Sequence, residues 1–438
     1  MQLSLDEGRA AARSAVLAGN FQLARDFALA LTEANPDDRT ALVVLAAAQP
    51  QLGQAREGRA AGLRAFRLST TESERYEAAR LVALAAANEE RYTLSQYWLR
   101  RAAANAPDPA AYAQTARDFR GISNLNPWSV RFAFNIAPSN NVNGGSVGDC
   151  NQYYTVIVDG IPQQFCFGTL SEDAQALSGV TATGDLRLRY RLSAGEDFIT
   201  QMTLRAYARN VWLSDDASES APDSRNSDFA SQVLEFGLSR EMRMGDGSLA
   251  AQVLFGTSWF GGDPSQRYVR GTLGYALPVG EATRLNLGGF VEKSYRYVGE
   301  WEPRSERISL NAGLTHILPS RDRVTGQIIF ERQFSDGVNE RYTSATAQLS
   351  YTYAEPLGPV RLSVQGGLSY TSFQDYQLLF PTPRDDTRLF ATVQATLHEI
   401  EYAGFVPVVR LTAEQTDSNV GRFTREAVTL DLGFRSSF

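Results

Sequence analysis

The sequence predicts an α + β protein with two parts, an N-terminal array of helical hairpins and a C-terminal barrel of fourteen antiparallel strands. Residues 5–119 are rich in Ala, Leu and Arg, and their apolar positions recur with the period of a helix. After Asn126-Pro127-Trp128 the apolar period changes to two and stays there to the C-terminus. We therefore expect a helical domain over residues 1–126 and a barrel domain over residues 127–438.

The composition agrees with a folded protein. Of the 438 residues, 43% are hydrophobic and 21% are charged, which is ordinary for folded chains. No run of 18 or more apolar residues exists, so no membrane-spanning helix is expected, although barrel strands would give a weaker signal. The net charge of −7 argues against nucleic acid as a partner, because phosphate binding favours a basic surface.

The helical third contains a repeat. A turn-like tripeptide followed by a small residue occurs three times, and the first interval, from Gly19 to Gly53, is 34 residues. This resembles the tetratricopeptide repeat, in which paired helices stack into an array. One interpretation is a helical spacer, and the other is a concave surface that holds an extended segment of another protein. The tripeptides are Gly19-Asn-Phe21, Gly53-Gln-Ala55 and Glu90-Arg-Tyr92, and the small residues are Ala24, Gly58 and Ser95.

The strand-rich part divides into fourteen segments, an even number. Connectors after the even-numbered strands are short, such as Ala194-Gly-Glu196 and Gly245-Asp-Gly247, whereas those after strands 1, 3 and 11 are long. This alternation is typical of bacterial outer-membrane barrels, whose short turns and termini lie in the periplasm. The expected strands are 130–138, 180–193, 197–212, 229–243, 247–260, 266–279, 283–298, 304–318, 322–335, 341–355, 358–373, 386–400, 404–417 and 422–438.

Arginines alternate with apolar residues on two neighbouring strands. Leu186, Leu188 and Leu192 would face lipid, because an arginine at mid-bilayer costs roughly 2–4 kcal/mol and the opposite register would expose several. The arginines would then line the lumen. They would either pair with acidic groups such as Glu235, Glu292 and Glu331, or form a positive strip that steers a translocating chain or holds a plug. The candidate lumen-lining or client-contact residues are Arg187, Arg189, Arg191, Arg205 and Arg209.

Both cysteines, Cys150 and Cys166, fall in the long first connector, 139–179. In an exported protein such a pair favours a disulfide, worth roughly 3 kcal/mol for a loop of this length, over a redox or metal pair. The connector would be either an extracellular loop or a plug. His316 and His398 are expected inside strands, and no hydrolase, metalloprotease or phosphate-loop motif occurs, so we expect no enzyme, no cofactor and no metal site.

Several short motifs carry a resemblance to a known family. They are Asn126-Pro-Trp-Ser-Val-Arg-Phe132, Ala137-Pro-Ser-Asn-Asn-Val-Asn143, Asp173-Ala-Gln-Ala-Leu-Ser-Gly179, Gly404-Phe-Val-Pro407 and Asp417-Ser-Asn-Val420. With them the chain resembles the surface lipoprotein assembly modulators, which join a tetratricopeptide domain to a fourteen-stranded outer-membrane barrel. The resemblance implies translocation of lipoproteins or soluble secreted proteins across the outer membrane.

The resemblance also implies locations and partners. Its loop motifs would place Asn140, Asn141, Asn143, Asp417 and Asn419 in extracellular loops, where they would either shape turns or contact a client. The expected partners are a client lipoprotein or secreted protein, outer-membrane lipid, periplasmic chaperones and the barrel-assembly machinery, with the chain itself a monomer. The alternatives are a polysaccharide-export porin with a periplasmic repeat domain, and a diffusion porin or receptor.

Overall fold

The computed structural model describes residues 4–297, 303–378, 381–400 and 405–436. The chain divides into two compact units, one made mainly of Met1–Ser129 and the other of Val130–Ile400 with Pro407–Arg435. Among the described residues, no helix combines the length and the apolar character that crossing a lipid bilayer requires.

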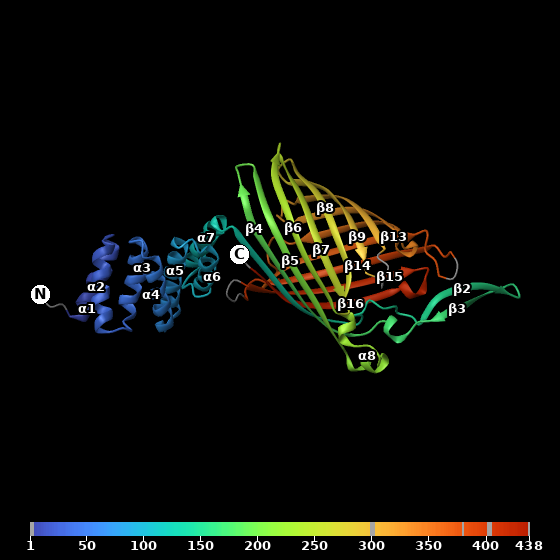
Figure 1. The fold of residues 1–438 in the computed structure, drawn as a ribbon, viewed down its shortest axis with the longest axis horizontal. Helices are drawn as coiled ribbons and strands as arrows, with labels where there is room; N and C mark the ends of the chain where they lie inside the picture. The colour runs from blue at the N-terminus through green and yellow to red at the C-terminus, as the bar shows by residue number, and fades with distance from the viewer. Residues whose placement is uncertain (1–3, 298–302, 379–380, 401–404, 437–438) are drawn as a thin grey trace. The chain divides into compact units, whose positions relative to one another are not determined.

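The first unit is an array of helices packed one after another (Figure 1). Consecutive helices contact each other, and α3 also contacts α1 and α5. The helical N-terminal region is confirmed, whereas its assignment as tetratricopeptide repeats stays a prediction. The seven helices in the described part of this unit are α1 (Leu5–Leu17), α2 (Phe21–Ala34), α3 (Arg39–Gln51), α4 (Ala55–Leu68), α5 (Glu72–Asn88), α6 (Tyr92–Ala103) and α7 (Pro109–Leu125).

The repeated tripeptides form the turns inside three helix pairs. Gly19, Gly53 and Glu90 have positive φ values of 72°, 76° and 59°, a conformation that ends one helix and starts the next. The small residues that follow allow close packing. A Cβ on Gly58 would lie 2.6 Å from the Pro50 ring, and Ser95 is buried with its hydroxyl donating to the Ala83 carbonyl.

The second unit is a closed barrel of fourteen antiparallel strands, which confirms the predicted barrel and its strand number (Figure 1). Each predicted strand corresponds to one barrel strand, and β1 pairs with β16 to close the ring. The strands are β1 (Trp128–Ser139), β4 (Gly179–Ala194), β5 (Phe198–Leu213), β6 (Ser231–Met244), β7 (Gly247–Phe260), β8 (Asp263–Val279), β9 (Thr283–Arg296), β10 (Arg304–Ile317), β11 (Arg323–Ser335), β12 (Tyr342–Thr352), β13 (Val360–Phe373), β14 (Arg384–Leu397), β15 (Phe405–Ser418) and β16 (Arg425–Ser436).

The two ends of the barrel differ. Connectors at one end are mostly short, such as the turn between β6 and β7, and β1 begins at this end. The other end carries the connectors between β1 and β4, between β5 and β6, and between β13 and β14. The second of these contains α8 (Asp215–Ser220) and η2 (Asn226–Phe229). Short 3-10 turns also lie at this end, namely η1 (Glu172–Ala174), η3 (Val338–Glu340) and η4 (Gly421–Phe423).

One feature was not predicted, and one prediction is wrong. The connector 139–179, expected as an extracellular loop or a plug, contains β2 (Cys150–Val158) and β3 (Ile161–Thr169), which pair as a separate two-stranded sheet. His398 was expected inside a strand, but β14 ends at Leu397 and His398 lies in the turn that follows. The strand ends before His398 because the pairing of β14 with β15 ends at Thr396.

Candidate functional site

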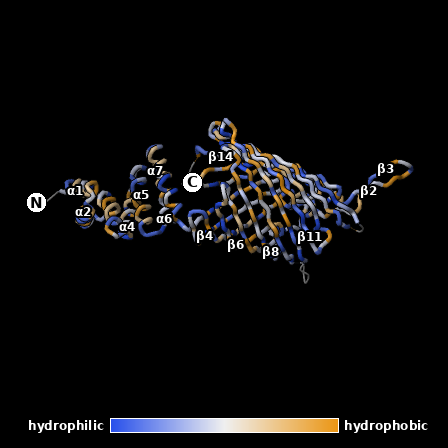
Figure 2. Tube along the Cα trace, turned by 90° about the horizontal axis from the view of Figure 1, so that it is seen from above, coloured by the Kyte–Doolittle hydropathy of each residue, from blue (hydrophilic) through white to orange (hydrophobic). Residues whose placement is uncertain are grey.

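The two faces of the barrel wall have opposite chemistry. On neighbouring strands, Leu204, Phe236 and Phe255 stand in register and are exposed on the outside. Arg205 and Glu235 are also paired in register, and their side chains contact each other on the inside. Figure 2 shows apolar and polar residues alternating along the barrel strands. The barrel therefore presents an apolar exterior and a polar lumen.

The arginines on β4 and β5 share an acidic partner that the sequence prediction missed. Asp185 accepts from Arg187 at 2.9 Å and from Arg205 at 3.0 Å, and Arg205 also lies 3.4 Å from Glu235. Asp185 stands on the same strand face as Arg187, two residues away, so the period of two could have identified it. Asp185 and Glu235 thus neutralise most of the positive charge of Arg187 and Arg205 within the barrel wall.

The other two predicted acidic partners belong to a different cluster. Glu292 accepts from Arg270 at 2.7 Å and from Arg307 at 2.9 Å, and Glu331 lies 3.9 Å from Arg307. The expectation that Glu292 and Glu331 neutralise the β4 and β5 arginines is therefore wrong. These glutamates stand on β9 and β11, where β8 and β10 supply arginines nearer to them.

The remaining candidate arginines have separate environments. Arg209 donates to the backbone carbonyls of Val142 at 2.5 Å and Phe229 at 3.1 Å, so it ties two long connectors to the wall. Arg189 has no ion pair with any residue that the structure describes, and Arg131 and Arg187 are its charged neighbours. Arg191 is in register with Gln201 on β5.

Strands β11–β13 carry a row of amide side chains. Gln348 donates to Gln327 at 2.6 Å, and Gln365 donates to Gln348 at 3.0 Å, so these three amides form a ladder across the strands. Beside it lies a small polar recess of about 290 Å³. Its lining consists of hydroxyl and amide side chains with one arginine: Ser363, Gln365, Thr392, Gln394, Arg410 and Thr412.

The asparagines of the first connector brace the place where β1 meets β16. Asn140 accepts from the Val428 backbone N–H at 2.7 Å. Asn141 is buried and its amide nitrogen donates to Gly145 O at 2.9 Å and Glu426 O at 3.1 Å. Asn143 donates to Gln175 O at 2.6 Å and accepts from Leu177 N–H at 2.9 Å. These contacts fit a role in shaping the loop.

The second loop motif meets the first connector. Asn419 donates to Pro383 O at 2.9 Å and accepts from Asp385 N–H at 2.8 Å, and its own carbonyl accepts from Gln152 at 3.2 Å. Asp417 is exposed and accepts only from Gln415, at 3.1 Å, within the described residues. Asn419 is therefore part of the rim, whereas Asp417 points to solvent.

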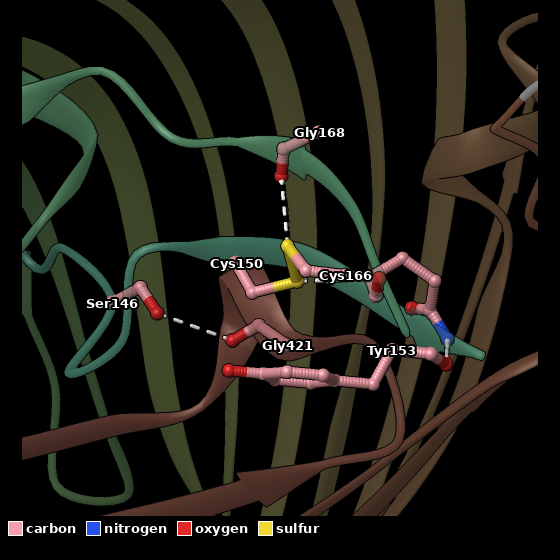
Figure 3. Close-up of a disulfide and its surroundings, with 7 residues drawn as sticks. Ser146, Cys150, Tyr153, Cys166, Gly168 and Gly421 are labelled. Carbon is pink, nitrogen blue, oxygen red and sulfur yellow. Dashed lines mark hydrogen bonds between the residues drawn. A yellow bond between two sulfur atoms is a disulfide. The ribbon is translucent and has the colours of Figure 1, made fainter. Parts of the chain in front are cut away.

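Cys150 and Cys166 form a disulfide at the base of the β2–β3 hairpin, with the sulfur atoms 2.06 Å apart (Figure 3). Cys150 is buried against η4, and the neighbouring Ser146 hydroxyl donates to the Gly421 carbonyl at 3.1 Å. The hairpin base is fixed to the rim by these contacts. The connector therefore folds outward as a hairpin in this structure, with no part of β2 or β3 paired to the barrel strands.

The helical unit contains a groove. The sequence predicts a concave surface in this unit but does not identify the residues that line it. It has a volume of about 1210 Å³ and is lined chiefly by α1, α3, α5 and α7, the first helix of each pair and the last helix. Its charged side chains are engaged at the edges, Arg80 with Asp118 and Glu77 with Arg39. The apolar lining includes Val16, Leu17, Val43, Leu81, Leu84, Ile122 and Leu125.

This groove exposes large apolar side chains to solvent. Leu17 is 89% exposed, Leu125 is 56% exposed and Leu84 is 42% exposed. Isolated exposed leucines are ordinary, but a contiguous apolar concavity is typical of a binding surface. These leucines and valines recur on the first helix of each repeat, and this pattern in the sequence could have predicted the groove.

The described residues contain no group of three or more His, Cys, Asp or Glu that could hold a metal ion.

Comparisons with known proteins show a likeness to solved outer-membrane barrels. No family model and no curated protein matches the chain. Among solved structures, a BenF-like porin from Pseudomonas fluorescens has 7% identity and a TM-score of 0.40, covering 70% of this chain and 98% of the porin. The outer membrane protein OprD from Pseudomonas aeruginosa has 8% identity and a TM-score of 0.36, covering 70% and 93%. The barrel assignment here rests on the strand pairing of this chain itself.

Proposed function

We propose that this chain is an outer-membrane translocon that moves client proteins, either surface lipoproteins or secreted soluble proteins, from the periplasm to the cell surface. The observation that carries the proposal is an apolar groove in a helical array joined in one chain to a closed barrel. Such a groove suits an extended or amphipathic polypeptide segment, whose apolar side chains bury against it. A diffusion porin would have no use for it.

The membrane assignment rests on solvent chemistry. The strands form a closed ring without an open edge, and the exposed leucines, valines and phenylalanines suit hydrocarbon. By analogy with other barrels the short-turn end would face the periplasm, and the helical unit, joined to the start of β1 there, would be periplasmic. Partners would be the client, outer-membrane lipid, periplasmic chaperones and the barrel-assembly machinery, and the translocon would act as a monomer.

Polysaccharide export is the second candidate, and the amide and hydroxyl side chains on β11–β15 favour it. A ladder of amides with neighbouring hydroxyls, and Arg410 beside them, offers hydrogen bonds to sugars. The apolar groove is the feature against it, because a hydrophilic polymer gains little by contacting leucines.

The test is delivery in intact cells. In a strain lacking the chain, proteins encoded beside its gene should lose surface exposure, measured by protease accessibility, and the wild-type chain should restore it. If a sugar polymer is lost from the surface while every tested protein remains there, polysaccharide export replaces this proposal.

A groove variant makes the test specific. Leu84→Glu places a charge in the apolar lining and should lower client delivery by about tenfold, the effect of losing ~1.4 kcal/mol of binding free energy. The matched control is Leu29→Glu, on α2 outside the groove, because Leu29 is 40% exposed and Leu84 42%. Equal delivery by the two variants would show that the groove does not contribute to client delivery.

A further inference from the structure

The β2–β3 hairpin combines features that folded proteins normally avoid on an exposed sheet. It is a two-stranded sheet with no third strand among the described residues, so both of its edges have backbone groups without a ladder partner. All of β3 is exposed, and Ile157 on β2 is 73% exposed. Figure 1 shows the hairpin projecting beyond the barrel rim, and Figure 2 shows apolar residues along it.

One edge of this hairpin lacks the usual protection against strand addition. The run Tyr153–Val158 reads Tyr-Tyr-Thr-Val-Ile-Val, with no charge, no proline and no glycine. Exposed edges are ordinarily blocked by Lys, Pro or bulges, and runs of this composition are those that accept another strand. The opposite strand, β3, carries Pro162, which has no N–H to offer. Only Asp159, in the turn, is charged between Cys150 and Thr169.

The hairpin is nevertheless held in one shape. An isolated two-stranded hairpin is marginally stable in water. Here the Asp159-Gly160 turn has positive φ at both positions, 54° and 79°, which matches the twist of the paired strands. The disulfide fixes the base, and Gln152 donates to Asn419 O at 3.2 Å on the rim. The turn, the disulfide and the contact with the rim therefore hold an uncharged edge in solvent.

We propose that the Tyr153–Val158 edge binds an extended, uncharged segment of the exported polypeptide by β-strand addition as that segment leaves the barrel. The inference rests on the proposed function, and the partner is the exported polypeptide at the end of the barrel where it leaves. Backbone pairing suits a client in transit, because every unfolded polypeptide carries unpaired N–H and C=O groups whatever its sequence. The apolar side chains on both faces of the hairpin would cover those of the bound segment.

The experiment uses the full-length chain in detergent and a fluorescent peptide with alternating Val and Thr residues flanked by lysines. Binding is followed by fluorescence anisotropy. A second peptide has the same sequence with alternate backbone nitrogens methylated, which removes hydrogen-bond donors on one edge and keeps every side chain. The first peptide should bind, and the methylated peptide should bind at least about tenfold more weakly, since its pairing edge is blocked.

Two lysine variants locate the edge. Thr155→Lys places a blocking charge on β2 and should weaken binding by about tenfold, whereas Gln163→Lys places the same charge on β3 and should leave it within about twofold. Both residues are exposed, so neither change disturbs the hairpin core. A double variant, Cys150→Ser with Cys166→Ser, reports separately on the fixed base and should also weaken binding.

Several results would overturn the inference. They are equal binding of the methylated peptide, equal loss in the two lysine variants, no binding of either peptide, hairpin-dependent dimers of the chain, or binding of lipid vesicles by the hairpin in place of peptide. The proposed function has its own readout in intact cells. If Thr155→Lys abolishes peptide binding but client delivery is unchanged, the edge has no role in export and the translocon proposal stands.

Discussion

Glu292 is the residue on which the lumenal ion pairs of β8–β10 depend. Its side chain is only 6% exposed and lies between Arg270, at 2.7 Å, and Arg307, at 2.9 Å. Glu292→Gln leaves two guanidinium groups facing each other without their shared anion. We expect the barrel to lose about 3 kcal/mol, at the low end for a broken buried pair because both arginines are partly exposed.

The measurement for Glu292→Gln is the temperature at which the purified chain in detergent loses its folded migration on a gel. Glu414→Gln is the matched control, because Glu414 pairs with Arg388 where both side chains are more than one-third exposed. That control should change stability by less than about 1 kcal/mol. Equal effects of the two changes would show that the enclosure of Glu292 contributes nothing.

At the scale of the element, the asparagine motif of the first connector is expected to act on stability. Asn141→Ala removes three hydrogen bonds at a buried position, those with Gly145 N–H, Gly145 O and Glu426 O. Because the backbone partners are left unsatisfied, we expect a loss of about 2 kcal/mol in barrel stability. Asp417→Asn, in the exposed part of the second motif, should be neutral.

The outcome of these two changes separates two interpretations of the motif. Lower gel-shift temperature together with lower delivery fits a structural clamp at the junction of β1 and β16. A client contact would instead lower delivery at unchanged stability, in Asp417→Asn as much as in Asn141→Ala.

Some of these elements could be predicted from the sequence and others could not. The barrel strands were predictable because each separates two solvents, so Arg205 and Leu204 must alternate in chemistry. The hairpin of β2 and β3 was missed because both of its faces are exposed, which removes the alternation. Its available signals were the Asp159-Gly160 pair and the flanking β-prone run. Asp185 is likewise predictable as the partner of Arg187, because it lies two residues away on the same strand face.

At the scale of the molecule, two units with separate cores predict two separate unfolding events. The helical unit has an Ala-rich core around residues such as Ala24 and Ala79, and its buried members among the described residues all come from the helices. In the described part of the barrel, the buried apolar cluster is a small one around Leu177, Ala217 and Ala221, so the barrel depends mainly on its closed ladder. Far-ultraviolet circular dichroism at the helical band follows the first unit, whereas heat-modifiable gel migration follows the barrel.

Acid should affect the helical unit through Glu7 and Glu74, which lie in the first turns of α1 and α5. Ser4 donates through its backbone N–H to Glu7, and Thr70 does so to Glu74, and these bonds hold the pKa of each carboxyl below its ordinary value. A lowered pKa in the folded state means that the stabilisation is present above the ordinary glutamate pKa, ~4.3, and is lost as the pH falls below it. Glu7→Gln with Glu74→Gln should flatten this acid dependence of the helical transition, measured by circular dichroism between neutral and acidic pH. The barrel transition, read on the same samples by gel migration, should keep the pH dependence of the wild-type chain. A helical transition in the variant that falls with acid as steeply as in the wild type would show that other carboxylates govern it.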